Sequence, residues 1–200
     1  MQSDPGLDSP AWRFNDSEVD MKKRGLFPAA VMWMAVLASP VVAADDKPRP
    51  VIEPNSPMLD YIVGRWEVEA TDPATGHVEK IGYEVQRFVG SAWVSGTAKS
   101  AEPGFSAKDV WGHDPLTREV VRLVFDSSGT YAIVRSPGWQ PDGTLVLEGD
   151  ARSANGIVRV RETIRRISAN EFQATWEAQR EGSWRAYSLE RAKRVQLERG

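Results

Sequence analysis

Residues 157–180, IVRVRETIRRISANEFQATWEAQR, decide the fold class. Two runs rich in β-branched and aromatic residues flank Ala169-Asn170, a pair typical of a tight turn. Val158, Val160 and Ile164 alternate with charged residues in the first run, and Phe172, Ala174 and Trp176 alternate with mostly polar residues in the second. Because successive side chains of a strand point to opposite faces, both runs predict strands with one apolar face. Such one-sided strands are typical of antiparallel sheets.

The same pattern continues on both sides of this segment. Turn clusters such as 72–76, 102–104, 127–129 and 141–143 recur at close, fairly even spacing. Together they predict ten strands, approximately 65–71, 77–88, 92–101, 107–113, 119–126, 130–136, 144–151, 157–168, 171–180 and 183–194. The other inward faces are expected to carry Trp66, Val68 and Ala70; Ile81, Tyr83 and Val85; Val121, Leu123 and Phe125; and Leu145 and Leu147. A sheet of this size avoids exposed edges by closing, so we expect an up-and-down antiparallel barrel, with one short helix over 58–63.

Composition restricts the chemistry. The chain has 200 residues, 41% of them hydrophobic, with eight Trp and a net charge of −3. A near balance of charges disfavours nucleic acid and anionic membrane surfaces as partners. The absence of Cys excludes a thiolate metal site and a cysteine nucleophile, and two histidines are too few for a three-His centre. We therefore expect no metal.

The first residues of the chain carry targeting signals. A basic cluster at 22–24, an apolar stretch at 26–37 and small residues up to Ala44 follow the order of a secretory signal peptide, 21–44. An uncleaved membrane anchor is the less favoured alternative, because prolines interrupt a barely sufficient span. The acidic segment 1–20 does not fit a signal peptide, so we expect translation to start at Met21. We further expect a Pro-rich tether at 45–57, a barrel at 58–195, a tail at 196–200, and a periplasmic or secreted protein.

One family shares several of these motifs. Gly64-Arg65-Trp66 follows the short helical segment, as a Gly-x-Trp does in lipocalin-like barrels. With 58–66, 90–94, 111–117 and 143–149, the chain resembles a bacterial family, the domain of unknown function numbered 1579, over about residues 57–194. The resemblance implies a lipocalin-like barrel, related in shape to fatty-acid-binding proteins and haem-binding nitrobindins, with no settled activity and no catalytic residues to carry over. The haem-binding relatives use a His from a late strand, and none follows His113, so we expect no haem and no other cofactor.

The aromatic side chains are candidates for lining a ligand cavity, since concave apolar walls with few polar groups suit small ligands. Each could instead simply fill the core, and Trp66 is expected to do so. His113 is a candidate ligand contact, although a structural role next to a turn is favoured. The candidate cavity residues are Tyr83, Trp93, Trp111, His113, Tyr131, Glu162, Arg166, Trp176 and Trp184.

Arginines crowd the eighth strand. Arg159, Arg161 and Arg165 share a face and could form an anion-binding wall. We favour a solvated outer face, on which they pair with Glu177, Gln179 or Glu190 on neighbouring strands. Glu162 and Arg166 are predicted on the inward side, where an ionised group needs a partner that could be a ligand.

Three functions follow from this pattern. The leading hypothesis is an exported protein that binds a small apolar or amphipathic ligand, with no membrane contact after signal cleavage. The second is a cofactor-independent barrel enzyme acting through Tyr, Arg and carboxylate groups, although no catalytic motif is present. The third is a filled barrel acting as a structural or interaction module.

Overall fold

A computed structural model describes residues 57–89, 92–101 and 104–195. The predicted signal peptide at 21–44, the segment 1–20, the tether up to residue 56 and the tail at 196–200 lie outside the described residues. Within the described ranges, no helix has the length and apolar character needed to cross a membrane.

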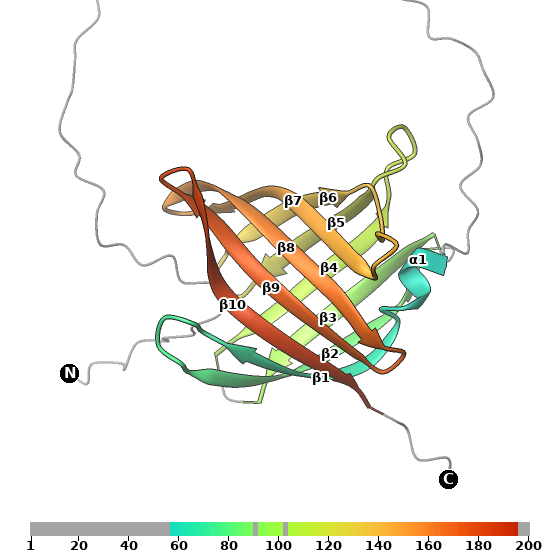
Figure 1. Cartoon of the computed structure of the whole chain (residues 1–200), viewed down its shortest axis with the longest axis horizontal. Helices are drawn as coiled ribbons and strands as arrows, with labels where there is room; N and C mark the ends of the chain where they lie inside the picture. Colours follow the sequence, from blue (N-terminus) through green and yellow to red (C-terminus); the bar gives the residue numbers. More distant parts are fainter. Residues whose placement is uncertain (1–56, 90–91, 102–103, 196–200) are drawn as a thin grey trace, which may run out of the picture. The chain divides into compact units, whose positions relative to one another are not determined.

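The chain forms the predicted ten-stranded antiparallel barrel, preceded by a single helical turn, α1, at Pro57–Asp60 (Figure 1). The helix is shorter than the expected 58–63. The strands are β1 (Gly64–Thr71), β2 (Val78–Phe88), β3 (Trp93–Ser100), β4 (Ser106–His113), β5 (Val120–Asp126), β6 (Tyr131–Ser136), β7 (Thr144–Ser153), β8 (Gly156–Ser168), β9 (Glu171–Arg180) and β10 (Ser183–Arg194).

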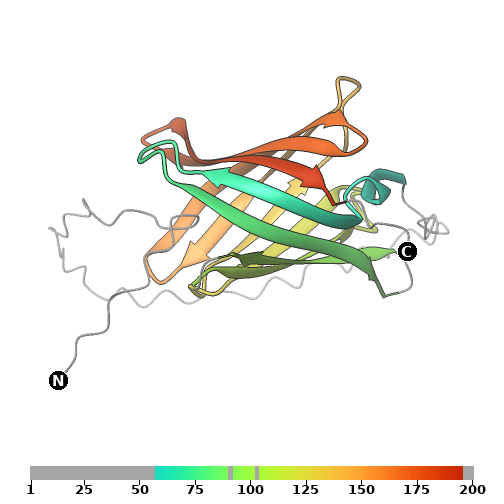
Figure 2. The same ribbon diagram turned by 90° about the horizontal axis from the view of Figure 1, so that it is seen from below.

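Each strand pairs with the strands that precede and follow it, and β1 closes the barrel by pairing with β10. The up-and-down topology is therefore confirmed. Closure leaves neither β1 nor β10 as an open edge that could pair with another chain. The view in Figure 2 shows α1 at one end of the barrel, next to the start of β1.

Most of the predicted inward faces are confirmed. Side chains on β1, β7 and β9 alternate as expected, with Trp66, Leu147 and Trp176 among the largest buried side chains. On β5 the prediction was wrong. Val120, Arg122 and Val124 face the interior, whereas Phe125 is 47% exposed and stacks on Tyr131 outside.

The reason lies in the register of β5 against β4. Arg122 is paired with Trp111, and Val124 with Asp109, and directly paired residues share a face of the sheet. Trp111 and Asp109 are both buried in the barrel. Both faces of β5 carry apolar residues, so its alternation alone could not identify the inward one.

A β-bulge in β10 inverts its alternation. Trp184 and Ala186 pair with Gln179 and Glu177 on the outer face, but after the bulge Ser188 pairs with the buried Trp176. An extra residue in one strand shifts the following side chains to the opposite face. Glu190, which we expected among the outer partners of the arginines, therefore points into the barrel.

The barrel end next to α1 is closed by Trp66. Its indole Nε1 donates a hydrogen bond to the carbonyl oxygen of Ile62 at 2.9 Å, and its ring packs edge-on against Phe172. The guanidinium of Arg194, on β10, covers the same ring at 4.1 Å and donates a hydrogen bond to the carbonyl oxygen of Tyr61. This network attaches the segment after α1 to β1 and β10, the two strands that close the barrel.

Candidate functional site

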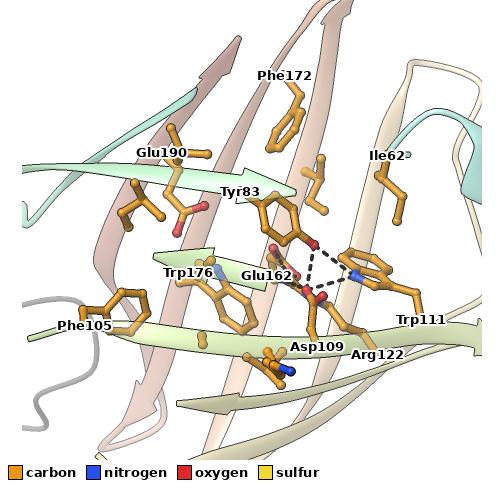
Figure 3. A pocket seen from close by; sticks show the side chains of 17 residues that line it. Ile62, Tyr83, Phe105, Asp109, Trp111, Arg122, Glu162, Phe172, Trp176 and Glu190 are labelled. Atoms are coloured by element: carbon orange, nitrogen blue, oxygen red, sulfur yellow. Dashed lines mark hydrogen bonds and ion pairs between the residues drawn. The ribbon is translucent and has the colours of Figure 1, made fainter. Parts of the chain in front are cut away.

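A cavity of about 70 Å³ lies inside the barrel, between β1–β5 and β8–β10. Its walls are mainly apolar, with Val68, Ile81, Val124 and Ile164 among the lining residues. A polar cluster occupies one wall, and Glu190 lies at a distance from it (Figure 3). Apolar walls with a few placed polar groups are typical of small-molecule sites.

Arg122 is the centre of the polar cluster. Its Nη2 and Nε donate hydrogen bonds to Oδ2 of Asp109 at 2.6 and 3.0 Å, and its Nη1 forms an ion pair with Glu162. Burial lowers the pKa of the guanidinium, but Glu162 and Asp109 outweigh burial and hold that pKa well above its ordinary value. One cation thus serves two buried carboxylates, and it remains charged.

Two aromatic side chains complete the cluster. Tyr83 Oη donates to Oδ2 of Asp109 at 2.7 Å, and Trp111 Nε1 donates to the same oxygen at 3.0 Å. The Trp111 ring also lies 4.3 Å from the guanidinium carbon of Arg122, a cation–π distance. Burial raises the pKa of Tyr83, and the neighbouring Asp109 raises it further, so the phenol stays protonated.

The close packing of this cluster requires Gly96 on β3. A Cβ at this position would overlap Oδ1 of Asp109 and the ring of Tyr83. Gly96 is paired with Asp109 in the sheet, so the absent side chain leaves the space that the carboxylate occupies. Oδ1 itself is buried and has no hydrogen-bond partner among the described residues. The wall of the cavity therefore contains an unused acceptor.

Glu190 is the second polar feature of the cavity. Burial raises its pKa to about 7, and the negative charge of Glu162 adds to this effect. Its hydrogen bond from Ser188 Oγ is long, at 3.4 Å. Within the described part of the chain, no Lys or Arg forms an ion pair with it. A carboxyl group that titrates near neutral pH therefore lies inside the barrel.

We expect Glu190→Gln to stabilise the barrel at pH 8 by about 3 kcal/mol and to have little effect below pH 4.5, as measured by urea unfolding across pH. The folded-state pKa of about 7 exceeds the ordinary 4.5, so the folded state holds the proton more tightly. The wild-type contribution is thus fully present below pH 4.5 and is lost as the pH rises through 7. Glu181→Gln, an exposed change of the same type, should show no such trend. A constant difference across pH would contradict this assignment.

The structure brings four of the predicted site residues to the cavity: Tyr83, Trp111, Glu162 and Trp176. Arg166 lies near the α1 end instead, where its guanidinium carbon is 3.7 Å from the Trp139 ring centre and 4.4 Å from that of Tyr61. His113, at the end of β4 and paired with Val120, does not line the cavity.

Three of the predicted cavity residues lie on the outer face. Tyr131 stacks on Phe125, and Trp184 lies beneath the guanidinium of Arg161 at 4.5 Å. The ring of Trp93 occupies the space over Gly112, where a side chain would otherwise stand. An aromatic residue on a strand is as useful for covering the outside of a small barrel as for filling its inside, so residue type did not separate the two.

The expected inward Glu162 has a partner, and the partner is protein. Arg122 fills the role that the sequence left open for a ligand. Of the expected outer pairs, Arg161 pairs with Glu177 at 2.8 Å. Arg159 instead lies 3.4 Å from Glu148, which was not among the predicted partners. These two pairs neutralise Arg159 and Arg161 on the outer face of β8.

Asp109, Arg122 and Glu190 are not among the site residues predicted from the sequence. Asp109 had a usable signal, because it lies two residues before Trp111 on the same face of β4. Arg122 and Glu190 had none, since their direction depends on register and on the bulge. In the described ranges, no group of three or more His, Cys, Asp or Glu residues could hold a metal ion.

Comparison with known proteins supports the fold alone. No family model and no curated protein matches the chain. Among solved structures, Rv2717c from M. tuberculosis is similar with a TM-score of 0.51 and 16% identity, covering 71% of this chain and 99% of its own. An S-type phycobiliprotein lyase from Guillardia theta aligns with a TM-score of 0.39 and 14% identity, over 70% of this chain and 92% of its own. The chain is thus a barrel similar in fold to Rv2717c.

Proposed function

We propose that the barrel binds a small apolar or amphipathic molecule in its internal cavity. The observation that carries this proposal is a mainly apolar cavity inside a closed sheet, with buried hydrogen-bonding groups on its wall. A volume of about 70 Å³ gives room for about five water-sized atoms, which suits a ligand of a few heavy atoms. The third hypothesis, a filled barrel, requires a solid interior that this cavity interrupts.

A neutral probe tests the proposal. 1-Butanol should shift the indole NMR signals of Trp111 and Trp176, which line the cavity, and should leave that of the outer Trp184 unchanged. Ala107→Leu places a larger side chain in the cavity and should weaken butanol binding at least tenfold. Ala154→Leu, in the exposed turn between β7 and β8, is the matched control and should bind like the wild type.

Two results would contradict the proposal. One is a wild-type protein whose indole NMR signals do not shift at a saturating concentration of butanol. The other is binding that Ala107→Leu leaves intact, because the probe would then occupy a different site. Circular dichroism of both variants verifies that the barrel is folded, since added methylenes in a packed interior cost about 1–3 kcal/mol.

Catalysis without a cofactor is the second candidate, and Glu190 is the observation that favours it. A carboxyl group with a pKa of about 7 is suited to general acid–base work near neutral pH. Binding and catalysis differ in what happens to the ligand. After long incubation with the protein, mass spectrometry of the recovered ligand should find its mass unchanged if the protein only binds it. Conversion that disappears in Glu190→Gln would favour an enzyme.

We further propose that the protein is exported, periplasmic or secreted, and that it belongs to the family it resembles. The support is the basic, apolar and small-residue order of 21–44 and the motif order over 57–194. N-terminal sequencing of the protein from fractionated cells should give a first residue of Ala44 or Asp45. A peptide from residues 2–13 would contradict translation from Met21.

A further inference from the structure

The interior of the barrel carries more negative than positive groups. Asp109 and Glu162 share the single guanidinium of Arg122. Glu190 and Glu79 also face inward, and neither forms an ion pair with a Lys or Arg of the described segments. A cavity with this balance opposes an anion and favours a positive ligand group.

Sheet register places the two unpaired carboxylates on either side of one small residue. Ala70 on β1 is directly paired with Glu190 on β10 and with Glu79 on β2. Directly paired residues share a face and have Cβ atoms about 5 Å apart. Because Ala70 ends at its Cβ, no longer side chain separates the two glutamates, and Glu190 of this pair lines the cavity.

Two carboxylate oxygens inside the barrel have no hydrogen-bond donor among the described residues. Glu79 is 9% exposed, and its buried Oε2 is one of them. Asp109 is 3% exposed and lines the cavity with an equally unsatisfied Oδ1. A buried acceptor without a donor is destabilising. The interior therefore offers acceptors that a hydrogen-bond donor could satisfy.

We propose that the ligand is a small aliphatic amine in its protonated form, and that Glu190 binds its ammonium group with Glu79 beside it. This inference rests on the proposed function. An ammonium supplies one positive charge and three hydrogen-bond donors, and these match the carboxylates of Glu190 and Glu79, which form no ion pair with a Lys or Arg of the described segments. Val68, Ile81 and Ile164 on the lining provide the apolar surface for a short alkyl chain. Figure 3 shows the Glu190 carboxylate on the opposite side of the Tyr83 ring from the Arg122 cluster.

Amine binding should depend on pH through Glu190. Burial raises the pKa of Glu190 to about 7. A bound ammonium would lower this pKa again, because a nearby positive charge favours the carboxylate. The other ionisable groups on the inner face are Glu79 and Tyr83 on β2, Asp109 on β4, Arg122 and Asp126 on β5, Glu162 on β8 and Tyr187 on β10. Lys108 on β4 also borders the cavity, although its side chain is exposed. The ionised fraction of Glu190 rises about tenfold between pH 6 and pH 8, and amine affinity should rise with it.

Three probes with a four-carbon chain test the proposal: n-butylamine, 1-butanol and butyrate, titrated against the ¹⁵N-labelled protein at pH 6 and pH 8. We expect butylamine to bind at least tenfold more tightly than butanol at pH 8, and about tenfold more weakly at pH 6 than at pH 8. Butyrate should bind least. In Glu190→Gln, the preference for the amine should disappear while butanol binding remains, and Glu181→Gln should retain the preference.

The outcomes separate the two proposals. If butanol binds and butylamine binds no better, the amine assignment is wrong and the proposed function stands. An amine preference that survives in Glu190→Gln, or tightest binding by butyrate, also overturns the assignment. If none of the three probes binds, both proposals fail.

Discussion

Arg122→Met should lower the free energy of unfolding at pH 7 by about 3–5 kcal/mol, measured by urea denaturation. The variant keeps a long side chain but leaves Asp109 and Glu162 buried without their shared cation. Two like charges then face each other in an interior where burial already disfavours them. Burial raises the pKa of Glu162, so protonation of this carboxylate relieves the repulsion and the loss should shrink as the pH falls.

Two comparisons make this prediction specific. Arg135→Met removes an ion pair with Asp114 on the exposed outer side, so it should cost less than about 1 kcal/mol. Combining Arg122→Met with Asp109→Asn and Glu162→Gln removes the charges together and should recover a large part of the loss. A single variant as stable as the wild type would show that Arg122 does not neutralise the cluster.

Trp66→Ala should lower the free energy of unfolding by about 3–5 kcal/mol as well. The ring is 1% exposed, packs on Phe172 and donates a hydrogen bond to Ile62, so its loss opens the barrel end and leaves the Ile62 carbonyl without its donor. The melting temperature should fall by about 10 °C or more in thermal unfolding monitored by circular dichroism.

Trp184→Ala is the matched control, because Trp184 has the same residue type but lies outside the barrel beneath Arg161. Its loss should be about 1 kcal/mol, in line with a partly exposed cation–π contact. Equal losses at the two positions would contradict the inside and outside placement of these indoles.

The interior charges have a consequence for function. A barrel meant only for stability would gain nothing from Glu190, which is unfavourable when ionised at pH 8. Costs of this kind are typical of sites where a group is kept for its chemistry. We therefore expect Glu190→Gln to gain stability at pH 8 and to lose the preference for the amine. Both effects have the same cause, the removal of a buried carboxylate.

Alternation along single strands was enough to predict the barrel. On β1, β7 and β9 the apolar residues occupy every second position, so the inward face is encoded locally, and the turn clusters separate the strands. On such strands the predicted cavity residues line the cavity where an aromatic residue also lies on the inward face, as Trp176 does. The same prediction was wrong for Tyr131 and Trp184, because a large aromatic ring is compatible with either face of a barrel wall.

By itself, the sequence determined the strand number, the antiparallel order and the inward faces of regularly alternating strands, because these depend on neighbours along the chain. Only the tertiary structure decided the polar interior. Arg122 reaches residues 13 and 40 positions away, and pairing with β4 turns it inward although β5 is apolar on both faces. A single extra residue in β10 likewise turns Glu190 inward and Trp184 outward. Register and bulges are set by the closing of the whole sheet, so no single strand carries that information.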